Sequence, residues 1–227
     1  MDAVRIGIFG GTFNPIHLGH LLLAETARET LKLDRVLFIT TRQPPHKRVR
    51  DLLAGPERLA LVQAAIQNHP AFVASDIELQ RTGPSYSIDT VRLLRQQLPT
   101  AKLFLLVGED MLGVRWLAWD ELKRLCTIVA ARRPGAAPSR RQRGMTPPPA
   151  PGWPRPTGSR GDPGRRSRPG PGGGVTWLPM PQMEISSSDI RARLKAGRSI
   201  RYLVPPAVER HIRQHHLYQA SGPGVES

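Results

Sequence analysis

Residues 7–20 read GIFGGTFNPIHLGH, and this stretch decides the fold that the sequence predicts. Residues 4–9 have the apolar character of a short buried strand, which the pair Gly10-Gly11 is expected to break. Residues 17–31 then repeat apolar side chains near a 3.6-residue period, as in a helix. A glycine turn would therefore lie between a strand and a helix N-terminus, where backbone N–H groups and the helix dipole suit a phosphate.

Two histidines in the same stretch strengthen the prediction of an anion site. His17 and His20 are three residues apart, so they lie on one face of the first helical turn and can point at the same anion. Taken alone, Gly10-Gly11 also fits an ordinary tight turn, because such turns need glycine for their geometry. A single histidine on a helix is usually structural.

Outward from this stretch, strand and helix signals alternate along the chain. Further strands are predicted at residues 35–40, 72–75 with 77–79, 102–107 and 127–131, and further helices at residues 56–68, 87–97, 119–125, 186–196 and 206–216. Apolar strands between helices indicate a parallel sheet that is covered on both faces. Ligands of such sheets bind at the carboxyl ends of the strands, where most polar motifs of this chain fall.

The formal net charge of +15 could suggest a nucleic-acid partner, but much of it lies in one segment. Residues 135–175 hold eight arginines and one aspartate. Residues 136–174 are rich in Pro and Gly and lack apolar periodicity, which predicts a disordered insertion into a single domain of residues 1–135 and 175–220. Its one aromatic residue is Trp153, so stacking on single strands is poorly supported and no specific nucleic-acid partner is expected.

Cysteine usage and hydropathy indicate the cellular compartment. The one cysteine, Cys126, excludes an internal disulfide and a Cys-rich zinc site. No stretch is apolar over the ~18 residues that span a membrane, and the N-terminus lacks a cleavable apolar leader. We therefore expect a cytoplasmic protein without a membrane partner.

The stretch ISSSDIR, residues 185–191, predicts a second anion site. Serine hydroxyls at a helix start, backbone N–H groups and an arginine one turn later would all favour a phosphate. Taken alone, the stretch also fits an ordinary N-cap. Together with GGTFNPIHLGH, it resembles the paired phosphate-binding motifs of the nucleotidyltransferase superfamily.

Shorter motifs indicate the branch of this superfamily. They are Pro44-Pro45-His46-Lys47, Gly83-Pro84-Ser85-Tyr86-Ser87, Val107-Gly108-Glu109-Asp110 with Trp116 beyond it, Arg132-Arg133, Tyr202-Leu203-Val204-Pro205-Pro206 and Leu217-Tyr218. In this order they resemble the motifs of bacterial nicotinate mononucleotide adenylyltransferases. The resemblance covers residues 4–135 and 175–218.

The resemblance implies an α/β fold, with a doubly wound parallel sheet of Rossmann-like type and a small C-terminal helical lobe. It implies transfer of AMP from ATP to nicotinate mononucleotide in NAD biosynthesis, which gives nicotinate adenine dinucleotide and pyrophosphate. Mg²⁺ would neutralise the triphosphate, held by phosphate oxygens and water rather than by protein side chains. The resemblance assigns catalysis to His17, His20 and Arg191, ATP binding to Gly10, Gly11, Thr12, Phe13, Gly108, Asp110, Ser187 and Ser188, and mononucleotide binding to Lys47, Ser87, Trp116 and Arg133.

Two other functions stay open on the sequence. The first is another adenylyl- or cytidylyltransferase, acting on phosphopantetheine or on nicotinamide mononucleotide. The motifs at residues 44–47 and 84–87 argue against the phosphopantetheine branch. The second is a nucleic-acid-binding protein that uses the arginine-rich segment. The sequence does not give the oligomeric state.

Overall fold

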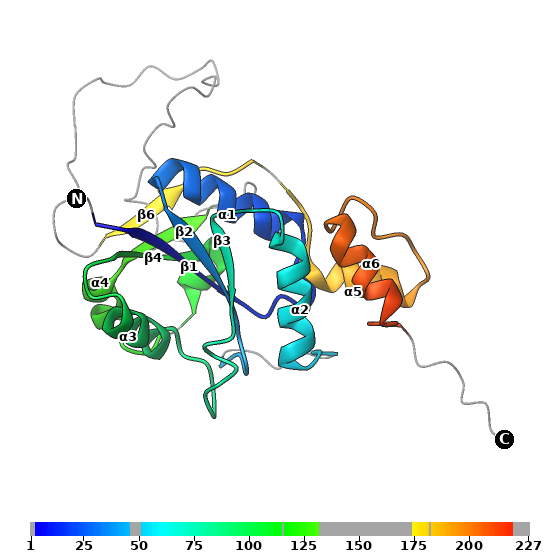
Figure 1. Cartoon of the computed structure of the whole chain (residues 1–227), viewed down its shortest axis with the longest axis horizontal. Helices are drawn as coiled ribbons and strands as arrows, with labels where there is room; N and C mark the ends of the chain where they lie inside the picture. The colour runs from blue at the N-terminus through cyan, green and yellow to red at the C-terminus, as the bar shows by residue number, and fades with distance from the viewer. Residues whose placement is uncertain (1–2, 46–50, 115, 132–173, 182, 220–227) are drawn as a thin grey trace, which may run out of the picture.

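A six-stranded parallel sheet organises the described part of the chain, with the strand order β3-β2-β1-β4-β5-β6 (Figure 1). The computed structural model describes residues 3–45, 51–114, 116–131, 174–181 and 183–219. The strands are β1 Arg5–Gly11, β2 Arg35–Thr40, β3 Phe72–Ser75, β4 Lys102–Gly108, β5 Thr127–Ala131 and β6 Val175–Leu178. The helices are α1 Leu18–Leu31, α2 Gly55–Ile66, α3 Ser87–Gln97, α4 Trp119–Leu125, α5 Ser187–Lys195 and α6 Pro206–Gln214, with a 3-10 helix at Glu109–Gly113.

Helices cover both faces of this sheet. One core packs α1 and α2 side chains, such as Ala24 and Leu61, against the sheet residue Phe38. A second core on the other face contains Ile88 of α3 and Leu122 of α4. The doubly wound, Rossmann-like arrangement that the sequence predicts is therefore confirmed.

The strand order reverses between β1 and β4, and the two strands separate there. Their ladder ends at the pair Ile8–Leu105, although β1 continues to Gly11 and β4 to Gly108. Sheets of this kind bind ligands at such a switch point, beyond the carboxyl ends of the strands. The glycine-rich stretch and the Val107–Asp110 motif both lie at this edge.

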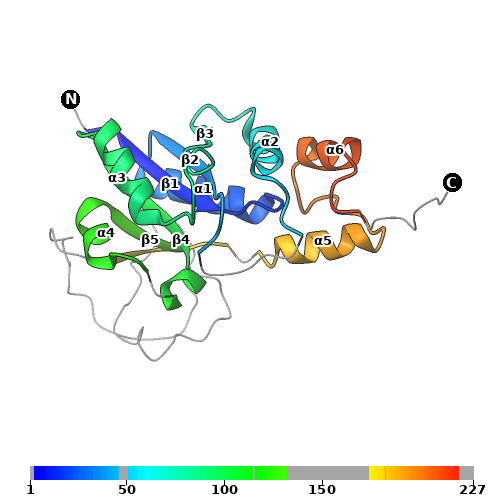
Figure 2. The same cartoon turned by 90° about the horizontal axis from the view of Figure 1, so that it is seen from below.

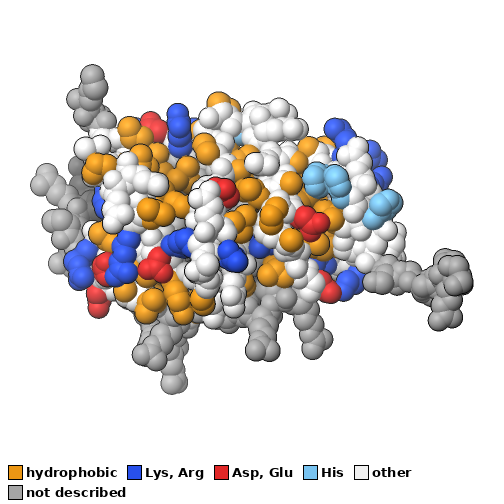
Figure 3. Space-filling view, turned by 60° about the horizontal axis from the view of Figure 1, so that its bottom comes forward, with side chains coloured by type: hydrophobic (Ala, Val, Ile, Leu, Met, Phe, Trp, Pro, Cys, Tyr) orange, Lys and Arg blue, Asp and Glu red, His pale blue; other side chains and the backbone are white. Residues whose placement is uncertain are grey.

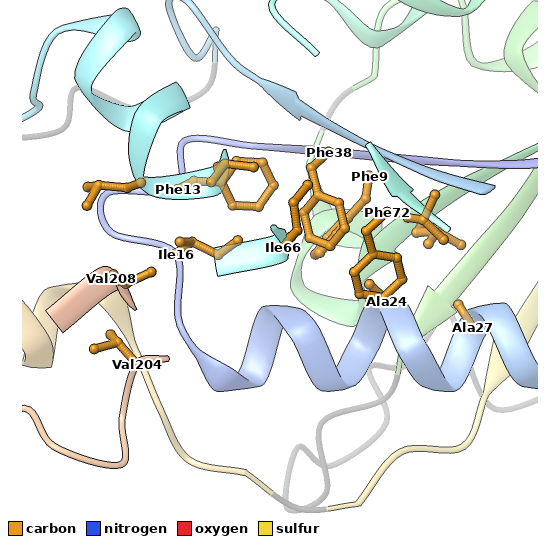
Figure 4. Close-up of a cluster of buried hydrophobic side chains, with 14 of the residues drawn as sticks. Phe9, Phe13, Ile16, Ala24, Ala27, Phe38, Ile66, Phe72, Val204 and Val208 are labelled. Carbon is orange, nitrogen blue, oxygen red and sulfur yellow. The ribbon is translucent and has the colours of Figure 1, made fainter. Parts of the chain in front are cut away.

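Aromatic side chains fill the core beneath the glycine-rich stretch (Figure 4). The rings of Phe9 and Phe38 lie 5.5 Å apart, and Phe9 meets Phe13 edge-on at 5.6 Å. Phe13 and Ile16 are fully buried. The loop after β1 is therefore anchored by its own apolar side chains.

The C-terminal lobe, which consists of α5, α6 and residues 196–205 between them, lies at one end of the molecule (Figures 1 and 2). It shares the core of α1 and α2, because Val204 and Val208 are buried in the same cluster (Figure 4). The N–H of Leu18 at the start of α1 also donates to the Leu203 carbonyl at 3.0 Å. The lobe thus packs directly beside the loop that carries the first motif.

Charges of both signs lie among hydrophobic side chains on the face drawn in Figure 3. Basic and histidine side chains gather at the end of this face formed by the C-terminal lobe. Within α6, Arg213 is paired with Glu209 at 2.7 Å. Within the described residues, no helix is long and apolar enough to cross a membrane.

The structure corrects the predicted elements at several ends. Gly10 and Gly11 do not break β1, because they pair with Ile39 and Thr40 of β2 and extend the strand to Gly11. The irregular turn instead occupies residues 12–17, and α1 begins at Leu18. Residues 77–79 form a turn rather than a strand, and α2, α5 and α6 end before the predicted positions. Pairing with β2, rather than the local glycine signal, therefore decides where β1 ends.

Candidate active site

The loop that joins β1 to α1 carries most of the first predicted anion-binding motif. Phe13 adopts a left-handed backbone conformation, with φ of 45°, which is costly for a residue other than glycine. Burial of the Phe13 side chain and of the next residue, Asn14, holds this conformation, since each residue is 1% exposed. The Asn14 amide donates to the Asp51 carbonyl at 2.9 Å and its Oδ1 accepts from the Leu53 N–H at 3.3 Å.

His17 and His20 come together at the start of α1, as the sequence predicts. His17 is the N-cap residue, and the two rings lie 3.7 Å apart between their centroids. The His17 N–H donates to Nδ1 of His20 at 3.2 Å. A neutral His20 therefore carries its proton on Nε2, which makes that atom a hydrogen-bond donor suited to a phosphate oxygen.

The second motif binds directly to the first, although 172 residues or more separate them in the chain. Ser187 donates from Oγ to the Pro15 carbonyl at 2.9 Å, and Arg191 donates to the Asn14 carbonyl at 2.8 Å. Arg191 also donates to Oγ of Ser188 at 3.3 Å. The two predicted anion sites are therefore parts of one site.

Helix α5 is capped in the way the serine run predicts. The Ser186 hydroxyl accepts from the Asp189 N–H at 3.0 Å, so this serine is the N-cap. Ser187 and Ser188 are then the first two residues of the helix, and Ser188 is exposed. Ser188 is thus placed with the helix N–H groups, where an anion is favoured.

A buried arginine, Arg58 of α2, ties the two neighbouring strand ends together. Its guanidinium donates to the carbonyls of Thr12 at 2.7 Å and Thr41 at 2.8 Å, beyond the ends of β1 and β2. Burial lowers the pKa of Arg58 from its ordinary value. Tyr218, at the end of the lobe, donates to Oδ1 of Asn14 at 2.8 Å, and burial raises its pKa.

On the other side of the switch point, β4 leads into the 3-10 helix through Gly108. A Cβ added at Gly108 would overlap Oδ1 of Asp110, so the two residues are in close contact. Asp110 is exposed, whereas Glu109 between them is buried. Gly108 and Asp110 are thus at the predicted edge of the sheet.

The residues predicted for the pyridine pocket lie around the segments after β2 and β4. Trp116 is half-buried, donates to the Met111 carbonyl at 2.6 Å, and its ring lies 5.5 Å from that of Trp119. Ser87 begins α3, and the nearby Ser85 accepts from the N–H of Arg42 at 3.1 Å. The segment before α3 is thus joined to the one after β2. Lys47, Arg133 and residues 136–173 of the predicted insertion lie outside the described residues.

Comparison with known proteins places this chain in a family. The model of the cytidylyltransferase-like family matches residues 8–193. A probable nicotinate-nucleotide adenylyltransferase of Shouchella clausii is 42% identical, with 94% of this chain and 96% of the relative covered. One of Thermus thermophilus is 39% identical, with 95% and 100% covered.

The chain belongs to the nicotinate-nucleotide adenylyltransferase family. Solved structures agree with this fold. Nicotinic acid mononucleotide adenylyltransferase of Plasmodium falciparum complexed with NaAD has a TM-score of 0.70 at 15% identity, with 95% of this chain and 97% of that chain covered. The same enzyme complexed with APC has a TM-score of 0.65 at 14% identity, over the same shares of the two chains.

Several residues that join the segments of the candidate site were not predicted as site residues. Arg58, Asn14, Ser85 and Tyr218 hold the loops through bonds that join distant segments. One signal could have found Arg58, because it precedes the buried residues Leu61 and Val62 by three and four positions. That spacing places a charged residue on the apolar face of α2.

Proposed function

We propose that this chain transfers AMP from ATP to nicotinate mononucleotide, giving nicotinate adenine dinucleotide and pyrophosphate. Family membership supports the reaction, and one observation supports the site: Ser187 and Arg191 bind the Pro15 and Asn14 carbonyls. These bonds bring the two motifs together beyond the carboxyl end of β1, which supports a shared role in phosphate binding. One polyphosphate can therefore be held from both sides.

The reaction needs charge stabilisation more than proton transfer. A phosphate oxygen of the mononucleotide attacks the α-phosphorus of ATP and forms a new P–O bond. The bond from the α-phosphorus to the oxygen that bridges it to the β-phosphorus breaks, and pyrophosphate leaves with the electron pair. The attacking phosphate is already ionised at neutral pH, so the site has to position two anions and neutralise the charge on the leaving group.

The residues present supply donors and positive charge for these tasks. Nε2 of His20 would donate to the transferring phosphate region beside His17, and the Gly10–Phe13 backbone would hold phosphates. Arg191, Ser187 and Ser188 would hold the β- and γ-phosphates from the start of α5. Gly108 and Asp110 would face the adenosine. Lys47, Arg133, Ser87 and Trp116 would bind the mononucleotide.

We propose Mg²⁺-ATP as the form of the nucleotide that is bound. Among the residues that the structure describes, no group of three His, Cys, Asp or Glu side chains could hold a metal ion. This donor set fits an ion that arrives on the triphosphate and keeps phosphate oxygens and water as ligands. We also place the reaction in the cytoplasm, with which the buried free thiol of Cys126 agrees.

One assay tests the function directly. Purified protein with Mg²⁺-ATP is given nicotinate mononucleotide, nicotinamide mononucleotide or phosphopantetheine, and both pyrophosphate and the adenylylated product are quantified. We expect the highest kcat/KM with nicotinate mononucleotide. Adenylylation of phosphopantetheine alone, or no pyrophosphate with any acceptor, would contradict the proposal.

Replacing Trp116 by alanine is expected to weaken nicotinate mononucleotide binding and leave ATP affinity nearly unchanged. Without the half-buried Trp116 ring, the pyridine ring of the mononucleotide would lose a stacking contact. By analogy with bases on aromatic side chains, this contact contributes roughly 1–3 kcal/mol to binding. Calorimetry with each substrate measures both affinities. If Trp116→Ala keeps mononucleotide binding and Trp119→Ala loses it, the stacking role belongs to Trp119.

Residues 136–174 are expected to be dispensable for turnover. Ala131 ends β5, and Val175 begins β6, which runs parallel beside it. A linker that replaces the segment must therefore return along the length of the sheet, which takes about a dozen residues or more. A Gly/Ser linker of that length should keep kcat and KM and reduce salt-sensitive binding to polyanions. Loss of turnover in this variant, with an unchanged unfolding temperature, would show that the segment contributes to the site.

A further inference from the structure

Arg58 is a charged residue that the reaction as described so far does not use. It is 1% exposed and comes first by volume among the fully buried side chains of the described residues. Its Nε donates to the Leu53 carbonyl at 2.9 Å, and Nη1 donates to the carbonyls of Thr12 and Thr41. Three backbone segments therefore meet on one guanidinium.

The charge of Arg58 has no acidic counterion in the described part of the chain. No Asp or Glu oxygen of those residues lies within 4.0 Å of its nitrogens. Burial of a charge in this way is costly, and carbonyl dipoles offset only part of the cost. A hydrophobic side chain of the same size would fill this space at lower cost, so packing alone does not explain an arginine here.

The bond to Thr12 fixes the direction of the next N–H group. The peptide between Thr12 and Phe13 is trans and planar, so the Phe13 N–H points away from the carbonyl that Arg58 holds. Among the described residues, none accepts a hydrogen bond from this N–H. The bond from Arg58 to the Thr12 carbonyl also helps to hold the left-handed φ of Phe13.

We propose that Arg58 is a positioning residue for phosphate binding, which holds the Thr12 and Thr41 carbonyls so that the Phe13 N–H is presented to the triphosphate. The inference rests on the proposed function only in taking ATP as the ligand. The buried positive charge behind the loop adds to the attraction for the anion, because few counter-charges screen it. Arg58 itself does not contact the substrate.

The matched control for Arg58→Met is Arg95→Met. Arg95 of α3 also donates to backbone carbonyls, to Ala101 at 2.7 Å and Leu125 at 2.6 Å, but at the amino ends of β4 and β5. Both variants remove one charge and several carbonyl bonds, and both can lower the unfolding temperature. We expect Arg58→Met, measured as folded protein, to raise the Kd for ATP roughly ten- to 100-fold, and Arg95→Met to change it less than about threefold.

A merely structural role would lower the folded fraction, and with it kcat, without changing KM. A positioning role raises KM for ATP and lowers kcat, with KM for the mononucleotide unchanged. In ¹⁵N-labelled wild-type protein, the Phe13 amide resonance should shift on titration with ATP, which tests the inference even if Arg58→Met fails to fold. An unmoved Phe13 resonance at saturating ATP, or equal Kd values in the two variants, would overturn it. Wild-type protein that binds ATP but makes no dinucleotide would contradict the proposed function and leave this inference standing.

Discussion

Replacement of His20 by alanine is expected to lower kcat about 100- to 1,000-fold while KM for ATP rises far less. The His17 N–H fixes the proton of neutral His20 on Nε2, because it donates to Nδ1. A donor at this place contacts charge that grows as pyrophosphate leaves, so its loss weakens the transition state more than the bound substrate. Steady-state measurement of pyrophosphate release gives both constants.

His69→Ala is the matched control for this variant. His69 also contacts α1, because its Nε2 lies 3.0 Å from a carboxylate oxygen of Glu25. Glu25 is seven residues into α1, so this contact lies away from the loop after β1. His69→Ala also removes one imidazole, but we expect kcat and KM to stay unchanged. A His20→Ala enzyme with kcat close to that of His69→Ala would exclude His20 from the mechanism.

Replacement of Arg191 by methionine is expected to raise the Kd for ATP roughly ten- to 100-fold. The variant loses a charge beside Ser188 and the charge-assisted bond to the Asn14 carbonyl at 2.8 Å. The β- and γ-phosphates would lose a cation, and the lobe would lose a contact with the loop after β1. Calorimetric titration with ATP measures the loss.

Arg193→Met in the same helix is the matched control. It separates the loss of the Arg191 contacts from the loss of one positive charge. Arg193 donates to the Ser199 carbonyl at 2.9 Å, within the C-terminal lobe. The net charge of both variants is lower by one, so long-range attraction for the anion falls by a similar amount. Equal ATP affinities in the two variants would contradict a direct role of Arg191.

The fold could be predicted because its signals are local. The apolar runs of β2 and β5 and the helical period of α3 were found with the observed bounds, Arg35–Thr40, Thr127–Ala131 and Ser87–Gln97. Element ends were less accurate. Gly10 and Gly11 were expected in a turn, but pairing with β2 keeps them in the strand, and no local signal carries that pairing.

The site could be predicted as two motifs but not as one structure. His17 and His20 are neighbours on a helix, so their spacing was enough to bring the rings together. Ser187 and Arg191 were predicted to bind an anion, yet nothing in their own sequence indicates that they also bind Pro15 and Asn14. Those contacts depend on how the C-terminal lobe packs.

The doubly wound sheet, the motifs that follow several strands and the family could all be predicted from the sequence, because these depend on residues that are close along the chain. Tertiary structure alone decided that Arg58 holds Thr12 and Thr41. It also decided that Tyr218 reaches Asn14 across 204 positions of sequence. The physical reason is that buried polar groups must find partners wherever packing brings them, and sequence distance does not limit that choice.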